Sequence, residues 1–357
     1  MDIAKATRKY EAWLADHLPL VKADLTLKHR RMRDDSFSFM RGTFYRWAQL
    51  WPDVCARLVN APRVLAVADL HIENFGTWRD TEGRLIWGVN DFDEVFTLPY
   101  TNDLVRLATS AALACETSRL AIDIDEACEA ILSGYTEGVN ARGQPYVLEE
   151  HHIWLRRLAL TALRDPVPFW HRMDALRPAR GPLSRGARRA LESMLPAPGL
   201  NYRVVHRVAG LGSLGRERLV ALAEWGSGRI AREAKGLAPS ACTWALDKST
   251  SEAYYEKAIA SAVRVPDPFV SVRRRWIVRR LAPDCSRMEL ASLPKERDEA
   301  KLLYAMGWET ANVHLGTRRA RKQILSDLRR RPSDWLEEGA RRMRTAVLED
   351  WKQWRAI

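Results

Sequence analysis

Two short apolar runs that lead into acidic residues constrain the fold of this chain more than any other feature. The first run, residues 64–67, is followed by Asp69, and the second, residues 85–89, is followed by Asp91. A turn-rich stretch at residues 79–83 separates the runs, which predicts two neighbouring strands with acidic groups at their exits. Three further polar residues follow the same runs: His71, Asn74 and Asp93. Oxygen ligands of this kind suit magnesium and its phosphates, although a β-hairpin with ordinary turn aspartates is the simpler alternative.

Length and composition predict an ordinary globular protein. The chain has 357 residues, of which 46% are hydrophobic and 29% charged, so it can bury a large core and form two domains. No apolar run approaches the roughly 20 residues that cross a bilayer, and the N-terminus is charged where a signal peptide is apolar. The five cysteines contain no CxxC pair, which argues against zinc. We therefore expect a cytoplasmic protein with reduced thiols and no membrane partner.

The net charge of +12 favours phosphate-bearing partners. Nucleotides, phosphorylated metabolites, nucleic acid and an acidic protein all fit this charge. Solvated helix faces explain it equally well, so charge alone does not choose among them. The basic residues cluster in four runs: 28–33, 273–280, 318–322 and 329–331.

The order of the expected elements is helices, a strand pair, helices, a small sheet and helices. Residues 1–60 and 102–140 have helical patterns, with Thr101 or Asn102 as the cap of the second. The helical pattern gives way to strand pattern near residues 195–200. We predict an α+β fold with three parts: a large helical lobe at 1–200, a small β-rich lobe at 201–285, and helices at 286–357 that return to the large lobe.

A glycine motif lies in the predicted small lobe. It consists of Gly210, Gly212 and Gly215, with Ser213 between the last two glycines. A strand-like run precedes it and a second strand-like run follows it. A dinucleotide-binding βαβ unit would instead continue into a helix. A glycine hairpin between strands is how protein kinases cover nucleotide phosphates with backbone amides.

A kinase-type site also needs a lysine on the next strand, and Lys235 lies at a suitable distance. A glutamate on the following helix should orient that lysine. Glu252 and Glu256 both qualify, and the sequence does not choose between them. The alternative is that Lys235 is a solvated lysine at the end of a strand.

The acidic segment, which we define as residues 69–94, resembles the other half of such a site. Kinases and aminoglycoside phosphotransferases have an Asp-x-x-x-x-Asn loop followed by a strand that ends in a metal-binding aspartate. Residues 69–74 match the loop and residues 89–93 match the strand end. The resemblance implies that Asp69 accepts the proton of the attacking hydroxyl, while Asn74 and Asp91 hold magnesium on the phosphates.

Other residues have supporting roles in this interpretation. Asp93 is a second magnesium ligand or a helix cap, and Asp103 matches an aspartate that braces the catalytic loop in phosphotransferases. Arg41 can reach a phosphate or pair with a carboxylate of the loop, or it is an ordinary surface arginine. His71 binds metal or substrate, or is a structural hydrogen-bonding residue, and His314 is expected to be a satisfied core histidine.

The motif order differs from that of an ordinary kinase, in which the glycine loop and lysine come first. The simplest account is a circular permutation, with the late sheet docked over the early acidic segment. The same motifs resemble the bacterial domain of unknown function 2252, which implies a kinase-like fold and leaves the substrate open. Ala68 departs from the glycine usual before the aspartate. The matching segments are Arg31–Met32, Phe39–Gly42, Asp69–Gly76, Asn90–Glu94, Asp103–Ala108, Gly210–Gly215 and Lys235.

Three function classes follow. The first is a phosphotransferase that uses ATP and Mg²⁺ on an unidentified hydroxyl-bearing small molecule or protein. The second is a metal-dependent phosphoesterase built on Asp69, His71, Asn74 and Asp91, which leaves the glycine motif and Lys235 unexplained. The third is a non-catalytic protein: a charge-driven binder of nucleic acid or of an acidic partner, or a pseudokinase that binds a nucleotide or nucleic acid. Nucleic acid is not the favoured ligand.

Overall fold

The computed structural model describes residues 1–357 apart from 118, 150, 161–164, 180, 248–253 and 286–297. Helices make up about half of this described part, and the strands form small antiparallel sheets. The predicted α+β class is therefore confirmed. Within the described ranges no helix combines the length and the apolar character needed to cross a membrane.

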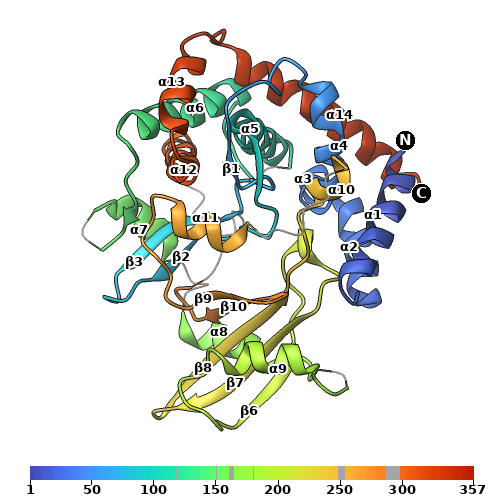
Figure 1. Ribbon diagram of the computed structural model, residues 1–357, viewed down its shortest axis with the longest axis vertical. Coiled ribbons are helices and arrows are strands. Elements are labelled where there is room, and N and C mark those ends of the chain that lie inside the picture. The colour runs from blue at the N-terminus through green and yellow to red at the C-terminus, as the bar shows by residue number, and fades with distance from the viewer. Residues whose placement is uncertain (118, 150, 161–164, 180, 248–253, 286–297) are drawn as a thin grey trace.

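The helices of the N-terminal part surround the acidic segment, and those of the C-terminal part return to them (Figure 1). The first set is α1 (Ile3–His17), α2 (Lys22–Asp34), α3 (Ser36–Gly42), α4 (Phe44–Val54), α5 (Tyr100–Glu116) and α6 (Ile124–Asn140). Three helices follow in the middle of the chain: α7 (Ile153–Ala159), α8 (Pro166–Asp174) and α9 (Arg185–Glu192). The last set is α10 (Ala241–Ala245), α11 (Tyr255–Ser261), α12 (Glu299–His314), α13 (Ala320–Leu328) and α14 (Trp335–Arg355).

The strands form three separate antiparallel sheets. One sheet pairs β1 (Arg63–Ala66) with β4 (Phe96–Pro99). A second has the order β2 (Phe75–Arg79), β3 (Leu85–Val89), β5 (Tyr146–Val147). The third has the order β6 (Tyr202–His206), β7 (Arg218–Trp225), β8 (Gly228–Gly236), β10 (Trp276–Leu281), β9 (Val270–Arg273). This five-stranded sheet lies at the opposite end of the molecule from α13 and α14 (Figure 1).

The predicted pairing of the two apolar runs was wrong. The first run forms β1 and the second forms β3, but they belong to different sheets. Residues 75–79, which the sequence pattern did not identify as a strand, form β2 and pair with β3. Residues 96–99 form β4, the partner of β1. The runs are buried on both faces, so their apolar pattern does not encode which strand pairs with which.

The expected start of the long helix was also wrong by two residues. Helix α5 begins at Tyr100 with Pro99 in the N-cap position, and no side chain caps it. Proline cannot donate a backbone hydrogen bond, so it suits the point where β4 ends and the helix begins. Fifteen of the seventeen residues of α5 are buried, which places this helix at the centre of the helical part.

Helices α8 and α9 cover opposite faces of the five-stranded sheet (Figure 1). Phe169 and Met173 of α8 pack against Val220 and other apolar residues of one face. Ala187 and Leu191 of α9 pack against the other face. The predicted limit between the helical lobe and the β-rich lobe, at residue 200, therefore comes after two helices that pack on the five-stranded sheet.

Candidate functional site

Segments that are distant in the sequence line a single pocket of about 630 Å³, measured with its open mouth. The acidic segment lines one side and the glycine loop, which we define as Gly210–Gly215, lines the other. Helices α2 and α3 complete the wall through Lys28 and Arg41. The expected juxtaposition of the late glycine motif and the early carboxylates is thus present in the structure.

The backbone before Asp69 is held by a buried aspartate. Both side-chain oxygens of Asp103 accept backbone hydrogen bonds, from Val67 at 2.6 Å and from Ala68 at 2.9 Å. His314 Nε2 lies 3.1 Å from Asp103 Oδ2, and all of these groups are buried. Asp103 therefore braces the loop, and His314 is a core histidine with hydrogen-bond partners, as expected.

Ala68 adopts a left-handed backbone conformation with φ of +69°. Glycine populates this region without a steric penalty, whereas alanine does so at some cost in free energy. This geometry favours glycine at position 68, which is the residue that the resemblance led us to expect before the aspartate. The two backbone hydrogen bonds that Asp103 accepts hold the strained turn in place, so the loop keeps its shape with alanine.

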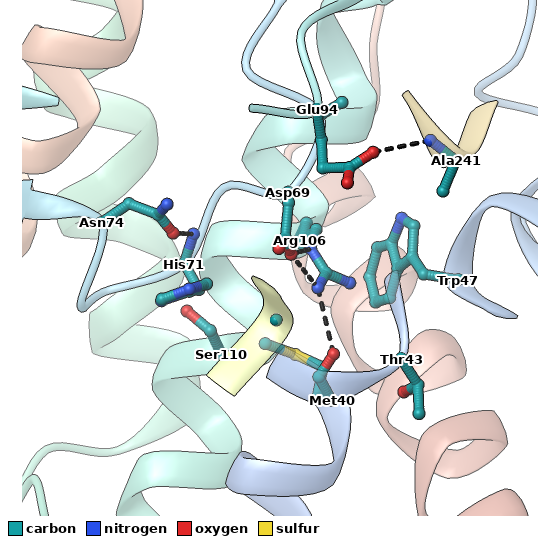
Figure 2. Close-up of polar contacts among 12 residues, drawn as sticks. Met40, Thr43, Trp47, Asp69, His71, Asn74, Glu94, Arg106, Ser110 and Ala241 are labelled. Carbon is teal, nitrogen blue, oxygen red and sulfur yellow. Dashed lines mark hydrogen bonds and ion pairs between the residues drawn. The ribbon is translucent and has the colours of Figure 1, made fainter. Parts of the chain in front are cut away.

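A buried arginine orients the Asp69 carboxylate. Arg106 Nε donates to Asp69 Oδ1 at 3.0 Å, and Nη2 of the same guanidinium also contacts Oδ1 while donating to the Met40 carbonyl at 3.1 Å (Figure 2). Burial raises the pKa of Asp69 to about 7; Arg106 lowers it, and Glu94 and Asp91 raise it. The carboxyl thus has one oxygen fixed by Arg106 and a pKa close to neutrality.

The rest of the loop is held by hydrogen bonds within itself. Asn74 Oδ1 accepts the His71 backbone N–H at 2.9 Å (Figure 2). His71 Nδ1 accepts the Glu73 backbone N–H at 3.1 Å. Arg41 Nη1 lies 2.5 Å from Glu73 Oε2. Of the alternatives weighed for Arg41, the structure therefore shows a pairing with a carboxylate of the loop. One lone pair of the Asn74 oxygen is already in use.

Lys235 joins the sheet to the acidic segment. Its Nζ lies 2.5 Å from Asp93 Oδ2 and 3.5 Å from Asp91 Oδ1. Burial alone would raise the pKa of Asp91, but Lys235, the contact with Asp93 and the charges of Arg279 and Arg218 together hold this pKa well below its usual range. Burial and the Asp91 charge raise the pKa of Asp93. Asp93 Oδ1 is buried without a hydrogen-bond partner in the described structure.

In the described part of the chain, Lys235 forms no ion pair with a glutamate of the helix that follows it. Glu256 is exposed on α11, and Glu252 lies outside the described residues. The two aspartates of the acidic segment take the place of that partner. Proximity along the sequence suggested the helix that follows β8, whereas the observed partners come from more than a hundred residues earlier.

The glycine loop presents backbone to Asp69. Gly210 and Gly215 have φ of +72° and +98°, a region that favours glycine. A Cβ atom at Gly212 would lie 3.1 Å from the Arg41 carbonyl oxygen and 3.4 Å from Asp69 Oδ2. The Ser213 hydroxyl accepts a hydrogen bond from Arg218 at 2.7 Å. The loop therefore packs closely over Asp69 and is tied to the sheet through Arg218.

Four charged residues of the site were missed by sequence reasoning. Arg106 follows Asp103 by three residues on the same helix, a spacing that places both on one face. Arg216 follows the glycine loop directly and pairs with Glu94 at 2.7 Å. Glu94 also accepts the Ala241 backbone N–H at 2.6 Å (Figure 2). The fourth residue, Lys28, lies in a basic run that appeared to be an ordinary helix face.

No self-sufficient metal centre is present in the described part of the chain, where no group of three or more His, Cys, Asp or Glu side chains could hold a metal ion. Magnesium usually binds one or two carboxylates and completes its shell with water and phosphates. Asp91, whose side chain is 36% exposed, and the unpartnered Oδ1 of Asp93 fit a magnesium ion of that kind.

Comparison with known proteins yields one match. Residues 20–163 match the model of a family described as an uncharacterized protein conserved in bacteria (DUF2252). This range includes the acidic segment and ends before the glycine loop, so it supports the resemblance to that family over less than half of the chain. Searches of curated proteins and of solved structures found no match.

Proposed function

We propose that the protein is a phosphotransferase with a circularly permuted, kinase-like arrangement. It would transfer a phosphoryl group from ATP, with Mg²⁺, to a hydroxyl group of a small molecule or a protein. The main support is that Asp69, Asp91, Asp93 and the first four residues of the glycine loop line one pocket, with Lys235 paired to the two aspartates behind its surface. A phosphoryl-transfer site needs a group that orients the hydroxyl, cations and amides for the phosphates, and carboxylates for magnesium.

Asp69 is the residue that accepts the proton in this proposal. Arg106 fixes Oδ1, while Oδ2 faces the glycine loop and is available to the substrate hydroxyl. The proton moves from the hydroxyl to Oδ2 as the hydroxyl oxygen bonds to phosphorus and the bond from phosphorus to the leaving ADP oxygen breaks. A pKa of about 7 suits a general base near neutral pH.

The other residues bind and neutralise the phosphates. Lys235 would contact the donor phosphates while its partners Asp91 and Asp93 hold the metal, and the backbone of the glycine loop would cover the phosphates. Bound magnesium would neutralise the charge that develops on the phosphate oxygens. The Asn74 oxygen already accepts one hydrogen bond and has one lone pair left for the metal, so Asn74 would contribute less to magnesium binding than Asp91.

The two alternatives have less support. A dinuclear phosphoesterase would need Asp69 as a metal ligand, but the guanidinium of Arg106 occupies Asp69 Oδ1 and repels a cation. A pseudokinase would retain the pocket and lack the proton acceptor, yet Asp69 is present and oriented. Nucleotide binding alone does not separate a pseudokinase from an enzyme, so the test must measure turnover.

The test combines nucleotide binding with product formation. MgATP at 100 times its dissociation constant should stabilise the protein by about 2.7 kcal/mol. ADP should then form, with water as a slow acceptor when no other is supplied. The variant Asp69→Asn should keep the stabilisation and lose about 100- to 10,000-fold in rate. Stabilisation by transition metals but not by MgATP, or unchanged turnover in Asp69→Asn, would refute the proposal.

A further inference from the structure

Lys28 is a buried cation that the proposed function leaves unused. It lies on α2, its residue is only 4% exposed, and it lines the pocket beside Asp69. Its Nζ donates to the Gly212 carbonyl at 3.2 Å and lies 5.8 Å from the centre of the Tyr45 ring. An ammonium group has three donors, and this carbonyl uses one of them.

The other cations of the site are neutralised by carboxylates. Arg41 pairs with Glu73, Arg216 pairs with Glu94, and Lys235 pairs with Asp91 and Asp93. Arg106, which lies behind the pocket wall, pairs with Asp69. Among the residues that the structure describes, Lys28 forms no ion pair with a carboxylate.

A buried ammonium without a counter-ion is costly, so its retention needs an explanation. Burial lowers the pKa of Lys28 to about 8, and the nearby carboxylates only partly offset this effect. An incoming anion would supply the missing counter-ion and the missing hydrogen-bond acceptors. Phosphate oxygens suit both needs because they are charged and accept several hydrogen bonds.

We propose that Lys28 binds the phosphate group that lies next to Asp69, and that this group is the terminal phosphate of the nucleotide donor. The position supports this assignment because Lys28 contacts Gly212, whose Cα faces Asp69 Oδ2. The proposal rests on the proposed function only for the identity of the ligand. The same chemistry would serve a phosphate carried by the acceptor, so the experiment must separate the two sources.

The experiment compares Lys28→Met with Lys22→Met by calorimetric titration. Methionine keeps most of the apolar stem, and Lys22 is an exposed lysine on the same helix. Lys28→Met should weaken MgATP binding by about 10- to 100-fold and leave MgADP binding within about twofold. Lys22→Met should change neither affinity. Equal weakening of both nucleotides, or of neither, would overturn the assignment to the terminal phosphate.

Two further measurements separate this proposal from its alternatives. Without ligand, Lys28→Met should unfold at the same temperature as the wild type or at a higher one, because an unpaired buried charge is removed. A lower unfolding temperature with unchanged MgATP affinity would indicate that Lys28 is purely structural and would overturn the proposal. If the wild type binds neither nucleotide, the proposed function fails, and the binding of inorganic triphosphate then tests the role of Lys28. It should bind the wild type at least about tenfold more tightly than Lys28→Met, and equal or absent binding would overturn the proposal.

Discussion

The acidic segment and the glycine loop face each other across one pocket but are held in very different ways. The turn that carries Asp69 is fixed from behind by Asp103 and Arg106, both of which are completely buried. The glycine loop is held by the bond from Val21 N–H to the Gly215 carbonyl, by the Arg218 bond to the Ser213 hydroxyl, and by the buried side chains of Leu211 and Leu214. Its middle contacts Asp69 and Lys28 through backbone atoms.

This difference suggests a division of roles. A proton acceptor must be held in a precise orientation, which buried hydrogen bonds provide. A phosphate-covering loop must admit a ligand, and its three glycines let the backbone approach that ligand closely, while Leu211 and Leu214 anchor the loop through buried side chains. The predictions below test this comparison, beginning with the residue that joins the two regions.

Lys235 connects the five-stranded sheet to the acidic segment through its ion pairs with Asp91 and Asp93. Lys235→Met should reduce ADP formation from MgATP by about 100- to 1,000-fold, the scale for removal of one preorganised electrostatic group. Initial rates over a range of MgATP concentrations would measure the loss. Lys322→Met, at an exposed position of α13, is the matched control and should leave the rate unchanged. A loss below about threefold for Lys235→Met would show that this ion pair only joins the two regions.

The brace behind Asp69 should be a major contributor to stability. Asp103→Ala leaves the backbone N–H groups of Val67 and Ala68 buried without acceptors, which should lower the free energy of unfolding by about 3 kcal/mol. Urea denaturation followed by tryptophan fluorescence would measure this change. Asp103→Asn retains one acceptor oxygen and should cost less. Full stability in Asp103→Ala would show that the acidic segment is not held from behind.

The ionisation of Asp69 should control the rate between pH 5.5 and 8. Only the ionised carboxylate accepts a proton, so the rate should rise with pH below the pKa of about 7 and level off above it. The expected increase from pH 5.5 to pH 7.5 is roughly 25-fold for one titrating group. Initial rates at saturating MgATP would give the profile, and the residual rate of Asp69→Asn should not follow it. A flat profile in the wild type would argue against Asp69 as the base.

The contact between the glycine loop and the sheet should contribute little to stability. Ser213→Ala removes the hydroxyl that accepts from Arg218, while Arg218 keeps its bonds to the buried Glu233. We expect a loss below about 1 kcal/mol in urea denaturation. The loop should also exchange its amide hydrogens faster in this variant. A loss as large as that of Asp103→Ala would remove the distinction between the two regions.

Much of the site was predictable from local patterns. The spacing of Asp69, Asn74 and Asp91 and the glycine motif are short-range features, and these three residues line the pocket together with Gly210 and Gly212. The glycine hairpin between strands was also predicted correctly, because β6 and β7 are antiparallel neighbours. Strand pairing was not predictable, because fully buried apolar runs carry no alternation that would specify a partner or a face.

The remaining site residues depend on contacts between distant segments. Lys28 and Arg216 belong to basic stretches that resemble solvated surface, and only packing against the pocket shows that they are buried. The partner of Lys235 was sought on the next helix, but it comes from the acidic segment. Ion pairs of this kind form wherever folding brings opposite charges together, and residue type alone does not identify the partner.

The sequence by itself predicted the acidic residues and the glycine hairpin to which we assign the chemistry, because both depend on residue type and local spacing. Tertiary structure decided how these elements meet: which strands pair, which arginine holds Asp69, and which lysine is buried without a counter-ion. The physical reason is that burial and the pairing of charges are properties of the packed chain, and they arise only when segments such as α2 and the glycine loop come into contact.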